Sequence, residues 1–373
     1  MNKVLKDYLP VIIYTLITII LLFTPTGFED AINYKEADRC KAEIIETNDS
    51  RIIDTGLVRS GEQTCKIKIL SGKFKGQETE GYNMLSGSLE NDKVFQKGDK
   101  ALVLISYKDN EIISASMIDH YRINLEAILS LAFVFLLLAY SGKGGFRAIL
   151  SFVMTVLIIW KILVPFALKG YNPIILSLAI TLALTFIIIS LVYGYDKRTL
   201  SAVSGGFLGV IVTCILSIIF TRAFKIHGAV MAYSESLLYS GYSNLNLTEI
   251  FMSSIFIGAS GAIMDLAVDI TSSIYEIVQK KPDISKSEAI KSGFTLGRAA
   301  MGTMTTTLLL AYSGGYIALL MVFMAQGTPI FNILNYKSVS SEILHTIVGS
   351  FGLVTVAPFT AVTSSLFLTN KSK

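Results

Sequence analysis

The stretch that decides the fold is NPIILSLAITLALTFIIISLVYG, residues 172–194. It runs for 23 residues without Asp, Glu, Lys or Arg. An α-helix needs about 20 apolar residues to cross the hydrocarbon core of a bilayer. We therefore predict a transmembrane helix over residues 172–194.

Seven further apolar stretches extend this pattern along the chain and give eight predicted spans. The spans are residues 8–24, 124–141, 146–168, 172–194, 200–221, 249–277, 300–325 and 340–368. The first is the shortest and follows Lys3 and Lys6, as a signal peptide would. Because no small-x-small cleavage pattern comes after it, we interpret it as a retained signal anchor.

The composition supports a membrane protein. Hydrophobic residues make up 52% of the 373 positions and charged residues only 16%, against about 25% charged in an average globular domain. This balance excludes a disordered chain, a nucleic-acid-binding protein and an ordinary soluble enzyme. Residues 29–122 hold 17 acidic and 14 basic side chains, and the rest of the chain holds 18 basic and 11 acidic ones. An acidic insert in a basic, apolar body is typical of a membrane protein with one soluble domain.

The basic residues predict the orientation, because cytoplasmic loops carry an excess of Lys and Arg. With the N-terminus inside, the inner segments hold 13 Lys and Arg and the short outer loops hold four. We therefore expect both termini in the cytoplasm. The predicted parts are a signal anchor at 1–24, an extracytoplasmic domain at 25–123, a seven-helix membrane domain at 124–368 and a cytoplasmic tail at 369–373.

The extracytoplasmic part has the pattern of a small β domain. Residues 65–69 (CKIKI) and 101–105 (ALVLI) are short strand-like runs, and turn residues such as Ser71-Gly72 and Asp109-Asn110 bound them. Four to six strands in about 80 residues predict either a small barrel, for which the OB type is a candidate, or a sandwich. The acidic balance argues against nucleic acid as its ligand.

Three cysteines have different expected roles. Cys40 and Cys65 both fall in the extracytoplasmic domain, where a disulfide between them would persist, so we consider this pair a candidate bridge. Cys214 lies in a span and is expected to be a small packing residue.

The sixth span carries the strongest functional candidates. Ionisable groups at membrane depth are costly, so each is a candidate functional residue. Asp265 and Asp269 are four residues apart and share one helix face, and Glu276 lies within about 40° of it. A face rich in oxygen suits a proton or a hard cation. The structural alternative is that one Asp pairs with a basic side chain or caps broken backbone.

The seventh span adds polar candidates. Arg298 is expected at the cytoplasmic mouth, where it forms either a gate or an ion pair with Glu276 or Asp269, or simply anchors the span. Hydroxyl groups follow it, and they either satisfy backbone groups or line a polar path: Thr303, Thr305, Thr306 and Thr307. Ser285-x-x-Glu288, before this span, predicts a capping box that begins a short amphipathic helix at the interface.

The eighth span contains two further patterns. Glu342-x-x-His345 places two metal-ligand types on one helix face and is a candidate metal site. Gly349, Gly352 and Pro358 favour a kinked or broken helix, and such helices often line transport sites. The alternative is a simple proline kink repaired by Thr355.

With these residues in view, the chain resembles the YibE/F family of bacterial polytopic membrane proteins. The matching stretches are residues 258–265 (GASGAIMD), 301–304 (MGTM), 308–312 (LLLAY), 349–352 (GSFG) and 358–361 (PFTA). The resemblance covers roughly residues 120–368 firmly and the outer domain loosely. It implies a location in the bacterial inner membrane, and its members are described mainly as membrane or transport proteins.

Two departures from the family pattern bear on the site. Family members commonly have an acidic residue after the Gly-Arg pair, where this chain has Ala299, and often Asn in place of Thr306. The outer domain resembles the YibE-type half of the family. The resemblance therefore implies a homo-oligomer, or a hetero-oligomer with a YibF-like partner that lacks the outer domain and completes the site.

Two functions remain open at this point. The first is a secondary transporter or permease for a small solute or ion, in which Asp265 and Asp269 carry a proton or cation and Arg298 sets the inner gate. The alternative is a non-transporting membrane scaffold or envelope sensor whose outer domain binds a ligand or partner. The sequence has no P-loop, zinc-protease pattern or nucleophile elbow, so we expect no enzyme activity and no cofactor.

Overall fold

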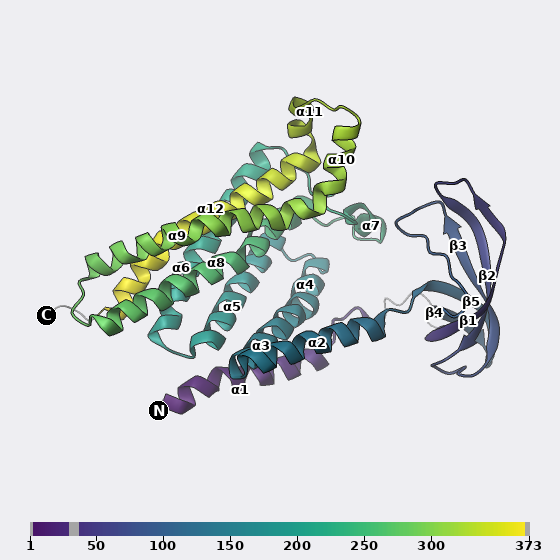
Figure 1. Cartoon of the computed structure of the whole chain (residues 1–373), viewed down its shortest axis with the longest axis horizontal. Coiled ribbons are helices and arrows are strands. Elements are labelled where there is room, and N and C mark those ends of the chain that lie inside the picture. Colours follow the sequence, from purple (N-terminus) through teal and green to yellow (C-terminus); the bar gives the residue numbers. More distant parts are fainter. Residues whose placement is uncertain (1–2, 30–36, 370–373) are drawn as a thin grey trace. The chain divides into compact units, whose positions relative to one another are not determined.

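The computed structural model describes residues 3–29 and 37–369 (Figure 1). These residues form two compact units. One unit comprises Met1–Phe28 and Tyr140–Lys373, and it holds most of the helices. The other, Glu29–Ala139, holds all five strands and most of the helix that follows them.

The five strands form a closed barrel in the order β1-β2-β3-β5-β4. The strands are β1 (Ala37–Asp54), β2 (Arg59–Ile69), β3 (Glu78–Ser86), β4 (Lys100–Lys108) and β5 (Glu111–His120). All pairs are antiparallel except β3 with β5, which is parallel and joins only Gly81 to Ala115 and Tyr82 to Ser116. The prediction of a small β domain is confirmed, and its form is the five-stranded barrel typical of OB-folds.

The alternating runs of the sequence form the barrel core. In β2, Cys65, Ile67 and Ile69 are buried, whereas Lys66 and Lys68 between them are exposed. Neighbouring side chains of a strand point to opposite faces, so this period of two separates core from surface. The remaining core side chains on β1, β4 and β5 are Cys40, Ala42, Ile44, Ala101, Val103, Ile105, Ala115 and Met117.

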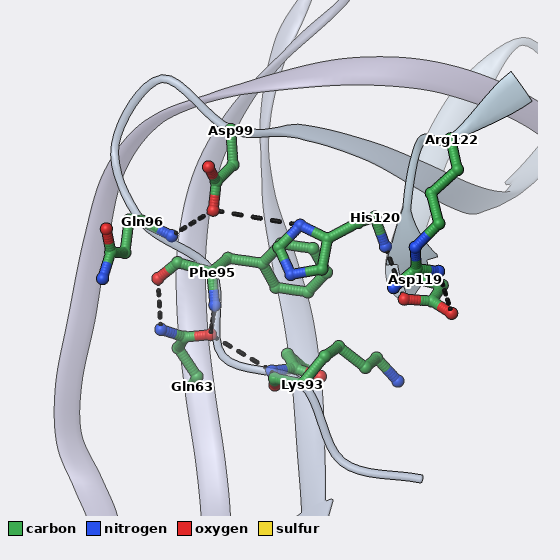
Figure 2. Close-up of polar contacts among 9 residues, drawn as sticks. Gln63, Lys93, Phe95, Gln96, Asp99, Asp119, His120 and Arg122 are labelled. Carbon is green, nitrogen blue, oxygen red and sulfur yellow. Dashed lines mark hydrogen bonds and ion pairs between the residues drawn. The ribbon is translucent and has the colours of Figure 1, made fainter. Parts of the chain in front are cut away.

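A buried polar network holds the segment between β3 and β4 in place. Gln63 on β2 is fully buried, and its amide nitrogen donates to the Phe95 carbonyl at 2.9 Å. The Phe95 N–H in turn donates to the Gln63 amide oxygen at 3.0 Å. Figure 2 shows this pair of bonds, with the Phe95 ring beside His120 at a ring-centroid distance of 4.7 Å. The Gln63 side chain therefore bonds to both the carbonyl and the N–H of Phe95 and holds the backbone there in place.

The described residues contain seven helical segments that are long and apolar enough to cross a bilayer. They are α2 (Ile123–Ser141), α3–α4 (Lys143–Leu168), α5 (Pro173–Tyr193), α6 (Lys197–Ala223), α8 (Leu247–Lys280), α9–α10 (Lys286–Ala325) and α12 (Lys337–Leu368). These correspond to seven of the eight predicted spans. The first predicted span corresponds to α1 (Lys3–Phe23), whose apolar part, Tyr8–Phe23, is shorter. Two short helices, α7 (Ser234–Tyr239) and α11 (Ile330–Asn335), lie in connections.

Side-chain caps mark where α8 (Leu247–Lys280) and α9 (Lys286–Ser313) begin. The side chain of Asn246 accepts from the Glu249 N–H at the start of α8. Ser285 does the same for the Glu288 N–H at 3.2 Å, which confirms this cap. The helix that Ser285 begins is not the predicted short interfacial one, because α9 runs without interruption from Lys286 to Ser313.

The core of the helical unit lies where α6, α8, α9 and α12 pack together (Figure 1). Glycines allow the close approach. Gly352 of α12 faces Thr213 of α6 and Ile263 of α8, and Gly349 faces Ala259. Hydroxyl groups add bonds between helices, such as Thr271 of α8 with Ser364 of α12 at 2.9 Å. The small residues of these helices therefore serve packing inside the unit.

The predicted break in the eighth span is absent. α12 is continuous from Lys337 to Leu368 and includes Pro358. Gly349 and Gly352 are packing residues, as their contacts show. Beside the proline, Thr355 donates its hydroxyl proton to the carbonyls of Phe351 and Gly352. Of the two predicted forms, the broken helix is therefore wrong, because the helical run continues through Pro358; the proline kink stays a prediction.

Candidate functional site

One exposed stripe on α8 carries the predicted acidic residues. Asp265, Asp269 and Glu276 are all exposed, and so are Gly258 and Gly261 on the same face. Their spacing of three, four, four and seven residues follows one side of a helix. The opposite side of α8 is buried in the bundle through Ile263, Leu266, Ala267 and Ile270.

The length of α8 gives the depth of these carboxylates. Its 34 residues make a helix of roughly 51 Å, whereas the hydrocarbon core is about 30 Å thick. Asp265 lies roughly 27 Å from the start of the helix and Asp269 roughly 33 Å. With the helix centred in the bilayer, both fall inside the hydrocarbon region. Glu276, at roughly 43 Å, falls outside it.

Two neighbouring helices border the stripe. On one side, the Tyr193 hydroxyl at the end of α5 donates to the Val268 carbonyl at 2.6 Å and lies 2.6 Å from the Ser272 hydroxyl. On the other side, Gly258 of the stripe lies against the Tyr312 hydroxyl of α9. The stripe therefore faces outward from the gap between α5 and α9.

The carboxylates of the stripe have no partner in the described part of the chain. Neither Asp265 nor Asp269 forms a hydrogen bond or ion pair there, and the two interact electrostatically one helix turn apart. Glu276 is likewise unpaired within these residues. Charged groups at this depth are costly when they face lipid, so Asp265 and Asp269 need water or another polypeptide beside them.

Arg298 lies close to the level of Asp269 but does not pair with it. The neighbouring Gly297 packs against Ile270 of α8 and Ala357 of α12, which sets this level. Arg298 is exposed. Within residues 37–369 it forms no ion pair with Asp269 or Glu276, so the predicted gate contact is not made in this structure.

The threonines of the seventh span bond to their own helix. Each hydroxyl donates to a carbonyl three or four residues earlier in α9, at 2.9–3.3 Å. The residues are Thr303, Thr305, Thr306 and Thr307, all but Thr305 exposed. Of the two predicted roles, this geometry matches the satisfaction of backbone groups.

Glu342 and His345 are brought together, but with too few ligands for a metal. The Glu342 Oε1 atom lies 3.7 Å from His345 Nδ1. The described residues contain no group of three or more His, Cys, Asp or Glu side chains that would hold a metal ion. The contacts of the pair are instead with Ser254 and two aromatic rings.

The two cysteines of the barrel are free thiols, so the candidate disulfide is corrected. Cys65 is paired with Thr47 across the β1–β2 ladder. Cys40 lies seven residues before Thr47 on β1, roughly 20 Å of extended strand. A disulfide requires Cα atoms within about 7 Å. Both thiols fill the barrel core instead.

Sequence reasoning missed Tyr193 and Ser254 as partners of the candidate residues. A tyrosine at the end of a span is common in membrane proteins, so its position alone does not single it out. Sequence reasoning also gave no partner for Lys161, whose Nζ donates to the Thr24 carbonyl just beyond α1, at 2.9 Å. Lys161 lies in a π-helical turn, Ile159–Leu163, which no pattern in the sequence predicted.

Together, the apolar helices, the acidic stripe and the barrel define a multi-pass membrane protein with one small β domain. The chain belongs to the YibE/F-like protein family, which it matches over residues 129–370. Residues 37–121 match the YibE/F family N-terminal domain. No curated protein and no solved structure matches the chain.

Proposed function

We propose that this protein is a secondary transporter or permease of the bacterial cell membrane, coupled to a proton or cation that binds at Asp265 and Asp269. The observation that carries the proposal is the pair of exposed, unpaired carboxylates one turn apart at membrane depth on α8. Two like charges this close favour binding of a cation or proton between them. A packing role would instead bury them with partners.

A second chain of the same family covers the stripe in this proposal. An Asp at the centre of a bilayer costs about 2.5–3.5 kcal/mol, so the stripe faces another polypeptide or water. Gly261 has open space in front of it, which allows a second helix backbone to approach closely. The partner is a second copy, or a YibF-like chain that supplies the acidic residue absent at Ala299.

The orientation is part of the same proposal. The excess of Lys and Arg on the inner segments supports cytoplasmic termini and an extracytoplasmic barrel. In this orientation α8 runs inward from its N-terminus. Arg298 and Glu276 then lie toward the cytoplasmic end of the site.

The test is flux through vesicles reconstituted with the purified full chain and its partner, screened with protons, monovalent cations and small solutes. D265N should reduce the flux at least tenfold, because the coupling carboxylate is gone. D283N, which removes an exposed carboxylate from the α8–α9 loop, is the matched control and should retain it. Equal flux in wild type and D265N for every species tested would contradict the proposal.

The barrel favours a second candidate function, that of an envelope sensor or scaffold. Leu57 and Leu89 are 85% and 78% exposed and line a cavity of about 330 Å³ at one end of the barrel, with Arg59 at its edge. Exposed apolar side chains around a cavity are typical of a binding surface. If L57S/L89S abolishes the cellular phenotype of the protein while D265N leaves it intact, the sensor function is the correct one.

A further inference from the structure

A cavity of about 630 Å³ lies where the barrel meets the first turn of α2. All of the residues that line it belong to one compact unit, Glu29–Ala139. Among these lining residues, three are cationic, Lys41, Lys100 and Arg122, and one, Asp99, is acidic. The volume falls in the range of about 300–1,000 Å³ that is usual for sites that bind small molecules.

The length of α2 sets the level of this cavity in the membrane. The helix has 19 residues and is therefore roughly 28 Å long, close to the thickness of about 30 Å of the hydrocarbon core. Its first turn thus lies at one boundary of the hydrocarbon. Asn124 and Leu125 of that turn line the cavity, and so does Tyr121 just before it. The cavity is therefore at the level of the phospholipid headgroups.

Hydrogen bonds hold the two-residue link between β5 and α2 in a fixed geometry. The Tyr121 N–H donates to the Lys100 carbonyl at 2.7 Å. The Arg122 carbonyl accepts from two N–H groups in the first turn of α2, at 2.9 and 3.0 Å. The Arg122 guanidinium also bonds to Asp119 at 2.7 Å, as Figure 2 shows. The barrel and the start of α2 therefore form the cavity without help from a ligand.

Neither lysine of the cavity forms an ion pair in the part of the chain that the structure describes. The Lys41 Nζ atom lies over the Tyr121 ring, 4.6 Å from its centroid. Lys100 is opposite Glu43 across the β1–β4 ladder, but the two side chains form no ion pair there. Two such cations at one cavity attract an anionic ligand, because the field of like charges adds up inside a cleft.

The acid of the cavity is engaged elsewhere. The Asp99 Oδ2 atom accepts from the Gln96 N–H at 2.8 Å and lies 3.9 Å from His120 Nδ1 (Figure 2). Residues 29–122 as a whole hold 17 acidic and 14 basic side chains. The cavity thus reverses the charge of the domain around it, at the point where that domain meets the bilayer.

We propose that this cavity binds the headgroup of an anionic phospholipid from the adjacent leaflet. Lys41 and Lys100 bind the phosphate oxygens, since an ammonium group binds phosphate as a point charge. The acyl chains enter the bilayer beside Leu125, which lines the cavity and is 70% exposed. A zwitterionic headgroup would bring a positive group into a cavity that is already positive, so an anionic headgroup is preferred.

The test is native mass spectrometry of the full chain in neutral detergent, titrated with phosphatidylglycerol or phosphatidylcholine. Wild type should retain phosphatidylglycerol at a concentration at least threefold lower than phosphatidylcholine, and K41Q/K100Q should lose this preference. K68Q/K108Q removes the same charge from exposed barrel lysines outside the cavity and should keep the preference. D265N should also keep it, which separates this inference from the proposed function.

A photoactivatable phosphatidylglycerol tests the wild-type chain without any substitution. Its cross-links should map to residues 98–100 or 121–125. Glycerol phosphate tests the soluble source of the same chemistry and should not displace the lipid at equal concentration, because it has no acyl chains.

Three results would overturn the proposal. The first is equal retention of phosphatidylglycerol by wild type and K41Q/K100Q. The second is a set of cross-links that all lie elsewhere in the chain. The third is displacement of the lipid by glycerol phosphate at equal concentration, which would make a soluble phosphate the ligand of the cavity.

Discussion

Gly205 of α6 lies directly against Thr360 of α12, with no room between them for a methyl group. We predict that G205A destabilises the helical unit by about 1–3 kcal/mol, because extra volume in a packed core forces neighbours apart. The measurement is the thermal unfolding midpoint of the full chain in mild detergent. G302A is the matched control, since Gly302 of α9 faces open space; an equal loss in both variants would contradict the packing explanation.

The space in front of each glycine distinguishes those packed inside the helical unit from those that a second chain could contact. Gly209 packs against Val356 and Ile263, whereas nothing lies in front of Gly261. G209L should therefore lower the yield of folded protein. G261L should leave the fold intact but reduce the mass of the complex in mild detergent. A wild-type particle containing one chain of 40.8 kDa that still supports activity would refute the proposed assembly.

Asp92 organises the loop after β3. Its carboxylate accepts from the N–H groups of Ser86, Gly87 and Ser88 at 2.7–2.9 Å, and these bonds, that of Ser86 first, hold the pKa of the carboxyl below its usual value. The folded form thus binds the proton less readily than the unfolded chain. The stabilisation is present above about pH 4 and is lost as the pH falls further.

Hydrogen exchange of the full chain tests whether the stabilisation by Asp92 is lost at low pH. At neutral pH, D92N should increase exchange at Ser86, Gly87 and Ser88 relative to wild type. Toward pH 3 the two proteins should converge, because wild-type Asp92 is then protonated as well. A difference that stays constant across this range would show that the carboxylate charge is not the cause.

The barrel thiols should be unreactive in the folded protein. Burial, with Asp38 near Cys40 and Asp49 near Cys65, raises the pKa of both thiols to about 11. Only about one thiol in 10,000 is then ionised at pH 7. Maleimide should label neither until the chain is unfolded. Unfolding without reductant should then expose three labelled cysteines, whereas a disulfide would leave Cys214 alone.

Topology is tested with reporters placed in exposed turns. Fusions at Lys143, Lys197 and Ser285 should report a cytoplasmic location, and one at Asn110, in the turn between β4 and β5, should report an external one. Asn83 is unsuitable because it is fully buried. A cytoplasmic signal at Asn110 would reverse the proposed orientation.

Features that depend on local composition could be predicted from the sequence. The uncharged, apolar run at 172–194 predicts a membrane span whatever its neighbours are. The alternation of apolar and charged side chains at 65–69 predicts a strand with one buried face. Features that depend on neighbours could not. A glycine such as Gly352 can break a helix or leave space for a neighbouring side chain such as Ile263, and the sequence alone does not distinguish the two. The distance between Cys40 and Cys65 depends on the register of the strands.

The candidate site shows the same division. The spacing of Asp265 and Asp269 predicts that they share a face, and they do. Which helices border that face depends on how α5 and α9 pack against α8. The spacing of residues along α8 gives no information about that packing. Ser254 and His345 are 91 residues apart, so only the folded bundle brings them together.

The narrow parallel pairing between β3 and β5 determines how the barrel opens. Only two residue pairs close it there, and a side chain added at Gly81 would collide with Met117. This seam is the weakest line of the barrel. Heat or a bulky residue at Gly81 should separate β3 from β5 first. The two strand edges would then be unpaired and could pair with strands of other chains. Because Gly81 lies directly against the core side chains of Ile67 and Met117, parting the strands at this point also exposes part of the barrel core.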